Sequence, residues 1–161
     1  MAVKRLIVVA CYISTIIACS GPRQATSSTI GFVTLYNYLL NPQQTFKDDV
    51  SYAFIRNQNE FEKMFYMTKA SPGTAVVPDF SSQSVVAIIF KPTQKVVSPY
   101  IQKAAIAGNE LRIYYSIADT SAGRTYEQTP FVVATVPKSS SITVASFYKD
   151  GIKEKTITPG L

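Results

Sequence analysis

Branched aliphatic and aromatic residues recur along this chain in short blocks, and polar or turn-forming residues separate the blocks. Such blocks, bounded by Gly, Pro, Asn, Asp or Ser, are typical of β-strands. The pattern therefore predicts strands at 30–40, 50–55, 85–90, 100–107, 111–118, 131–136, 142–147 and 152–157.

Three of these blocks predict a central strand and a hairpin within the sheet. Residues 85–90 read Val-Val-Ala-Ile-Ile-Phe without alternation, which indicates a central strand covered on both faces. Residues 100–107 and 111–118 flank Gly108-Asn109-Glu110 and predict a hairpin. Apolar and polar residues alternate in its second arm, so we expect one buried and one solvent-facing side.

One short helix is expected near the start of the domain. Asn59 and Glu62 have the spacing of a capping box. Phe61, Met64 and Phe65 then follow the spacing of a single buried helical face. Ser71-Pro72-Gly73 is expected to close this segment.

Two further segments complete the expected fold. Asp119–Thr129 is polar and contains Gly123, which predicts a mobile loop, and Asp150-Gly151 predicts a tight turn. We therefore expect a strand-rich α+β domain with one short helix. Its sheet is expected to be an antiparallel β-sandwich or half-barrel of about seven strands.

The N-terminus has the pattern of an export signal. Lys4 and Arg5 precede an apolar run that is too short for a transmembrane helix. The run ends in Ile16-Ile17-Ala18-Cys19, which resembles the lipobox of bacterial lipoproteins.

This resemblance implies that residues 1–18 are cleaved and that Cys19 is acylated. We then expect residues 19–29 to form a flexible tether and residues 30–161 to form one domain. It also implies a bacterial cell envelope location, at the outer membrane if the host has one, because Ser20 follows the cysteine.

Composition excludes several kinds of chemistry. The chain has no histidine, so Ser–His–Asp triads, Cys–His dyads and histidine-containing zinc sites are impossible. Cys11 lies in the predicted signal, which leaves Cys19 without a disulfide partner. The net charge is +6, but the basic residues form no stripe of the kind that binds nucleic acid. We expect no metal, cofactor or small-molecule substrate.

Four groups of residues are catalytic or metal-binding candidates, and the sequence favours a functional role for none of them. Ser146 and Lys149 match Ser-x-x-Lys, but residues three apart on a strand point to opposite faces. The other groups are adjacent or dispersed carboxylates, namely Asp48 with Asp49, Glu60 with Glu62, and Asp119 with Glu127. We therefore expect no enzymatic activity.

Aromatic residues suggest a second kind of site. The chain has ten tyrosines and no tryptophan. Tyr100, Tyr114 and Tyr126, together with Arg124, are candidate partner-binding residues, because tyrosine provides a large contact area at low entropic cost. The alternative is that tyrosine pairs across strands simply stabilise the sheet.

Several segments, read in order, resemble the C-terminal domain of the PrcB family, lipoprotein subunits associated with a surface protease complex. They are residues 55–65, residues 78–87 and the Thr-x-Pro-aromatic-like strand 129–138. Ser98-Pro99-Tyr100 stands where the family has a Gly-Gly-Tyr-type element, so both glycines are missing. The resemblance implies assembly or stabilisation of a partner and supplies no catalytic residues.

The sequence thus predicts a non-enzymatic, envelope-anchored module that binds another envelope or secreted protein, with an exported protease complex as one such partner. A small protease inhibitor that uses the 119–129 loop is an alternative. A structural envelope component is another.

Overall fold

The computed structural model describes residues 26–68 and 76–158. Within these residues eleven strands and one helix form, so the strand-rich α+β prediction is confirmed and the expected count of about seven strands is too low. The elements are β1 (Ser27–Ile30), β2 (Val33–Thr34), β3 (Tyr38–Leu40), β4 (Val50–Ile55), α1 (Gln58–Met64), β5 (Phe65–Met67), β6 (Gln83–Phe90), β7 (Thr93–Ala107), β8 (Glu110–Gln128), β9 (Phe131–Pro137), β10 (Val144–Lys149) and β11 (Ile152–Ile157).

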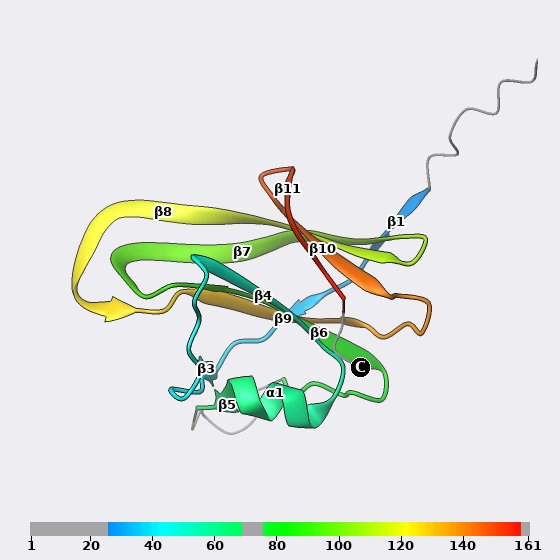
Figure 1. Cartoon of the computed structure of the whole chain (residues 1–161), viewed down its shortest axis with the longest axis horizontal. Coiled ribbons are helices and arrows are strands. Elements are labelled where there is room, and N and C mark those ends of the chain that lie inside the picture. The colour runs from blue at the N-terminus through cyan, green and yellow to red at the C-terminus, as the bar shows by residue number, and fades with distance from the viewer. Residues whose placement is uncertain (1–25, 69–75, 159–161) are drawn as a thin grey trace, which may run out of the picture.

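Four strands in the middle of the chain form one long antiparallel hairpin that is folded over on itself. β6 pairs with β9, and β7 pairs with β8 beyond them. The Phe90 N–H donates to the Pro130 carbonyl, 2.9 Å away, near the bend. Pro92 and Pro130 lie where the hairpin passes from one sheet to the other, and proline suits this bend because it lacks the N–H that a ladder needs. The bend forms the left end of the molecule in Figure 1.

The two halves of this hairpin belong to two large sheets. The five-stranded sheet has the order β1-β7-β8-β10-β11, and the four-stranded sheet has the order β2-β9-β6-β4. Figure 1 shows them one above the other. All strand pairings are antiparallel except β8 with β10, which is parallel and departs from the antiparallel sheet expected from sequence. The Asp150-Gly151 turn after β10 is confirmed, with φ values of 49° and 85° that suit a type I′ hairpin.

Strand β6 is covered on both faces, as its sequence predicts. Val86 and Ile88 enter the core between the two large sheets, whereas Val85 and Ile89 enter a second core. The first core includes the buried face of β8 predicted from its alternation, with Leu111, Ile113 and Tyr115 at most 1% exposed.

The second core lies beneath the four-stranded sheet, where α1 and a small β3–β5 sheet cover it. Phe61 and Phe65 fill it, which confirms the predicted helical face. The predicted cap is wrong by two residues, because Asn57 rather than Asn59 caps the helix: its side chain accepts the Glu60 N–H at 2.9 Å. The helix ends at Met64, and the segment expected to close it, 71–73, lies outside the described residues.

Three other expectations need correction. The predicted strand 30–40 is broken into the last residue of β1 and the short strands β2 and β3, and Asn37 interrupts it in a left-handed conformation with φ 68°. Ser27–Thr29, assigned to the tether, pair with β7 and belong to the domain. Asp119–Gln128, expected as a mobile loop, continues β8 and pairs with the start of β7.

Candidate functional site

The solvent-facing side of the five-stranded sheet holds the candidate site, and we call it the outer face. Alternation along each strand decides which side chains reach it. Its members are the side chains opposite the buried ones, among them Lys103 of β7, Arg112 and Tyr114 of β8, Tyr148 of β10 and Lys153 of β11. Neither hydrophobic core lies on this side, and in Figure 1 no described helix or strand covers it.

Four of these side chains form one row across four strands. The register places Tyr114 opposite both Lys103 and Tyr148, and Tyr148 opposite Lys153. The Tyr114 and Tyr148 rings stack with centroids 4.8 Å apart and planes inclined by 22°. The Lys103 Nζ lies 5.7 Å from the Tyr114 centroid, and the Lys153 Nζ lies 6.0 Å from that of Tyr148. We call this set the lysine–tyrosine row. It consists of two stacked aromatic rings flanked by two cations, all held by paired strands.

Glu110 balances part of the positive charge beside this row. Its carboxylate accepts a hydrogen bond from Arg112 Nε at 2.7 Å and lies 3.4 Å from Lys153 Nζ. Burial acts to raise the pKa of Glu110, but hydrogen bonds from Ser146 and Arg112 outweigh it and lower the pKa. The hydrogen bond to Glu110 in turn raises the pKa of Arg112. Glu110 therefore fixes two cations in place while Lys103 is left without a carboxylate contact among the described residues.

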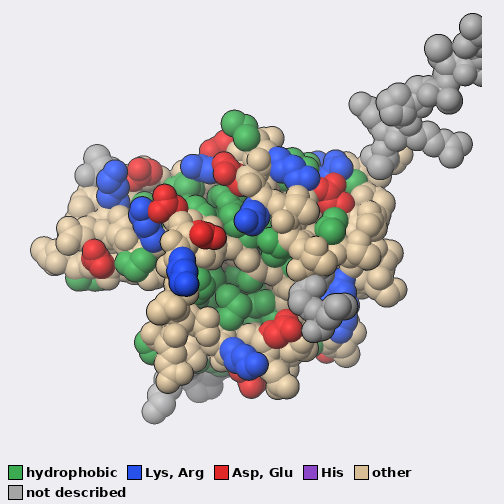
Figure 2. Space-filling model, viewed as in Figure 1, with side chains coloured by type: hydrophobic (Ala, Val, Ile, Leu, Met, Phe, Trp, Pro, Cys, Tyr) green, Lys and Arg blue, Asp and Glu red, His purple; other side chains and the backbone are tan. Residues whose placement is uncertain are grey.

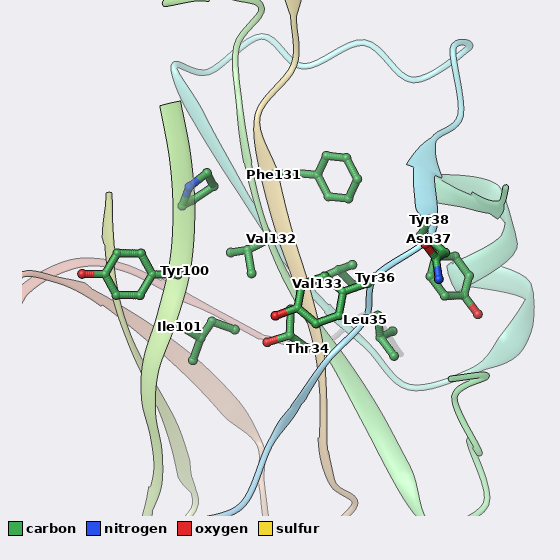
Figure 3. A pocket seen from close by; sticks show the side chains of 11 residues that line it. Thr34, Leu35, Tyr36, Asn37, Tyr38, Tyr100, Ile101, Phe131, Val132 and Val133 are labelled. Carbon is green, nitrogen blue, oxygen red and sulfur yellow. The ribbon is translucent and has the colours of Figure 1, made fainter. Parts of the chain in front are cut away.

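The structure brings two of the four predicted binding residues to the outer face. Tyr114 lies in the lysine–tyrosine row, and Tyr100 lies opposite Ser116 on the same face with 46% of its surface exposed. The Tyr100 segment also borders a pocket of about 410 Å³. In Figure 3 the Tyr100 ring points away from the other labelled side chains of this pocket. Tyr100 therefore lies at the margin of the pocket while its ring extends away from it.

Arg124 and Tyr126 do not join this group. They lie near the bend of the long hairpin, in the part of β8 that pairs with β7 alone. Their side chains contact each other, with the guanidinium carbon 5.9 Å from the ring centroid, and Tyr126 is 62% exposed. The four predicted residues thus form two pairs on different parts of the molecule.

The serine and the lysine of the Ser-x-x-Lys motif lie on opposite faces of the five-stranded sheet. Ser146 lies opposite Arg112 on the outer face, is fully buried, and is hydrogen-bonded to Thr156 at 2.8 Å. Lys149 lies opposite Tyr115, whose side chain faces the core. This Ser–Lys pair therefore lacks the geometry that a lysine base requires.

The candidate carboxylates do not converge either. Asp49 pairs with Lys91 at 2.6 Å on the surface. Asp119 and Glu127 lie at opposite ends of one stretch of β8. Among the described residues no group of three or more His, Cys, Asp or Glu side chains is arranged to hold a metal ion.

Sequence reasoning did not propose three members of the row, namely Lys103, Tyr148 and Lys153. Their role depends on which strands are neighbours, and above all on the parallel pairing of β10 with β8, which places Tyr148 beside Tyr114. Tyrosine on the polar side of an alternating strand was the available signal, and it identified Tyr114 alone.

No family model, curated protein or solved structure matches this chain. In the described residues no helix is both long enough and apolar enough to cross a membrane.

Proposed function

We propose that this chain is a bacterial lipoprotein anchored through Cys19, and that its domain is a non-enzymatic module that binds another envelope or secreted protein. The observation that carries the proposal is the lysine–tyrosine row on an uncovered outer face. The two large facing sheets, which we interpret as a β-sandwich, hold that face rigid.

The chemistry of the row favours a protein surface with exposed carboxylates. Tyrosine rings that are already stacked lose little conformational entropy on binding, and buried tyrosines are frequent hot spots in interfaces. Lys103 and Lys153 flank the rings, so an acidic partner surface would match them in charge.

The position of the anchor is compatible with this role. β1 begins at Ser27 and is an edge strand of the same five-stranded sheet. Seven residues separate it from Cys19, so a fully extended connection would span at most ~29 Å. In Figure 1 the chain enters β1 at one end of the sheet.

The resemblance to the PrcB family favours an exported protease complex as the partner. Neither rival function gains a supporting observation: Asp119–Gln128, which was to supply an inhibitor loop, is strand-paired.

Two experiments test the proposal. Metabolic labelling with an alkyne-bearing palmitate analogue is expected to mark the wild-type chain and not Cys19→Ala. Affinity purification from membranes is expected to recover a partner with wild type and with Lys47→Glu, a matched charge change elsewhere on the surface. The partner should be lost with Lys103→Glu and with Tyr114→Ala. Equal recovery with all variants, or no specific partner at all, would refute the assigned surface.

A further inference from the structure

Strand β4 is an outer strand of the four-stranded sheet, and its features invite another strand. It hydrogen-bonds to β6 alone among the described residues, although β11 also lies close to it without pairing. Its six residues carry no charge, no proline and no register shift. Long regular edges of this kind are templates for strand addition. The other outer strands are protected, because β11 carries Lys153-Glu154-Lys155 and β1 and β2 are shorter.

The ladder with β6 determines which backbone groups face outward. The Lys91 N–H donates to the Asp49 carbonyl at 3.0 Å. Hydrogen-bonded and non-hydrogen-bonded pairs alternate in an antiparallel ladder, so Ser51 and Ala53 also bond to β6. The N–H and C=O groups of the intervening residues, Val50, Tyr52 and Phe54, therefore point away from β6 along the open edge.

The side chains on this edge lie at the margin of the first core, between the two sheets. Val50 and Tyr52 are half-buried against the first core, and Phe54 is buried in it. Figure 2 views the molecule from the side on which β4 and β11 lie in front, and apolar side chains show at its centre with Lys, Arg, Asp and Glu around them. A strand added to β4 would cover this apolar margin.

We propose that the added strand is β4 of a second copy of this chain, paired antiparallel about a twofold axis at Tyr52. Only outward-facing residues can form the hydrogen-bonded pairs of the new ladder. A centre at Tyr52 meets this condition, because it places Tyr52 opposite itself and Val50 opposite Phe54 of the partner subunit.

The charges that flank the strand are complementary in this register. Asp48 lies one residue beyond Asp49, and continuing the ladder places it opposite Arg56 of the partner subunit. The symmetry produces this pair twice. Asp48 is exposed, whereas Arg56 is only partly exposed, donates a hydrogen bond to the Ile142 carbonyl and lies over the Phe54 ring, 5.2 Å from its centroid. Asp48 would therefore meet the part of the guanidinium that stays exposed. The directly paired residues, Val50–Phe54, carry no charge.

This self-association goes beyond the proposed function and has a consequence for it. A twofold axis perpendicular to the extended sheet leaves both five-stranded sheets on the same side of it. The two outer faces then point the same way, so two lysine–tyrosine rows could engage one partner assembly with added avidity.

Cysteine cross-linking tests both the surface and the register. Ser51 lies opposite Ala53 of the partner subunit as a non-hydrogen-bonded pair, with Cα atoms about 4.5 Å apart, which is within reach of a disulfide. Two full-length chains are made in detergent, each with Cys11→Ser and Cys19→Ser; one also carries Ser51→Cys and the other Ala53→Cys. Under mild oxidation the mixture is expected to give several-fold more cross-linked dimer than either chain alone. In a dimer of two identical chains, each cysteine faces a residue other than cysteine, and the two cysteines lie diagonally across the ladder.

A backbone variant supplies the control. Val50→Pro removes an outward N–H at the first residue of an edge strand, where proline is tolerated. Added to both chains, it should abolish the cross-link and leave the thermal unfolding midpoint nearly unchanged. Asp48→Lys should lower the yield several-fold. A mixture that cross-links no better than the single chains, or a cross-link that survives Val50→Pro in folded protein, would overturn the proposal. Neither result depends on an outer-face partner.

Discussion

Tyr115 and Tyr52 form a hydrogen-bonded tyrosine pair inside the domain, and its response to pH is the sharpest test of the core. Their hydroxyl oxygens lie 2.7 Å apart, and the two rings are in edge contact at 6.2 Å. Tyr115 is 1% exposed. Burial, reinforced by the hydrogen bond with Tyr52, raises the pKa of Tyr115 far above the ordinary value.

This shift determines how the stability should change with pH. The folded domain keeps the Tyr115 phenol neutral, whereas the unfolded chain releases that proton above pH ~10. The contribution of Tyr115 to stability is therefore fully present below pH ~10 and is lost as the pH rises, at about 1.4 kcal/mol per unit. Tyr115→Phe removes this titration together with one hydrogen bond, whose loss should cost about 1–2 kcal/mol at pH 7.

We therefore expect the stability difference between wild type and Tyr115→Phe to fall from about 1–2 kcal/mol at pH 7 to near zero around pH 11. The measurement is urea unfolding followed by circular dichroism across this range. Ile113→Val is the matched control, because Ile113 is fully buried on the same face of β8 and has no titratable atom. Its cost of about 0.5–1.5 kcal/mol should stay constant with pH. A Tyr115→Phe difference that is equally constant would refute the assignment of a protected phenol to this position.

Three further predictions concern the core, the helix cap and a surface carboxylate. Phe147 is fully buried between the sheets, so Phe147→Ala should lower the free energy of unfolding by about 3–5 kcal/mol and the melting temperature by about 12–20 °C. Ile152→Ala, at an exposed position on the neighbouring strand, should change the free energy of unfolding by no more than about 0.5 kcal/mol. Similar shifts for the two variants would contradict the closed core. Asn57→Ala should destabilise the domain by about 1 kcal/mol in chemical unfolding while Asn59→Ala should not, and the reverse order would restore the cap expected from sequence. Hydrogen bonds from two following serines hold the pKa of Asp79 at about 2, so the stability that it contributes should persist above its ordinary value of 3.8 and be lost as the pH falls toward 2; a carboxyl NMR titration with a midpoint near 3.8 would contradict this.

The local parts of the fold could be predicted from sequence. Residues 50–55 match β4 at both ends, and the hairpin after 100–107 and the turn at Asp150-Gly151 also form. Each depends on contacts between neighbouring residues or on a turn with a strong residue preference. The helix shows the limit of such reasoning, because Asn57 and Asn59 both have a Glu three positions later and the pattern alone does not choose between them.

The elements that were not predicted from sequence either pair with strands distant in the chain or lack a periodic pattern of apolar residues. Asp119–Gln128 is a strand whose side chains are mostly exposed on both sides, so it has no apolar alternation to reveal it. The apolar block 30–40 looks like one strand, but its pieces pair with three different strands: β1 with β7, β2 with β9 and β3 with β5. The parallel pairing of β10 with β8 is equally non-local, and it decides the candidate site, because it brings Tyr148 against Tyr114.

The layering of the molecule limits where a partner can bind. One face of the four-stranded sheet packs against the other large sheet, and α1 with β3 and β5 covers its other face. Both faces of that sheet are thereby committed to the fold. The β4 edge of that sheet and the outer face of the five-stranded sheet are then the two surfaces that we assign to binding. The edge is uncharged and regular and suits a copy of itself, whereas the outer face is cationic and aromatic and suits a different, acidic protein. Because the two surfaces differ in chemistry and do not overlap, self-association and partner binding can occur together, and variants at Val50 and Lys103 should separate them.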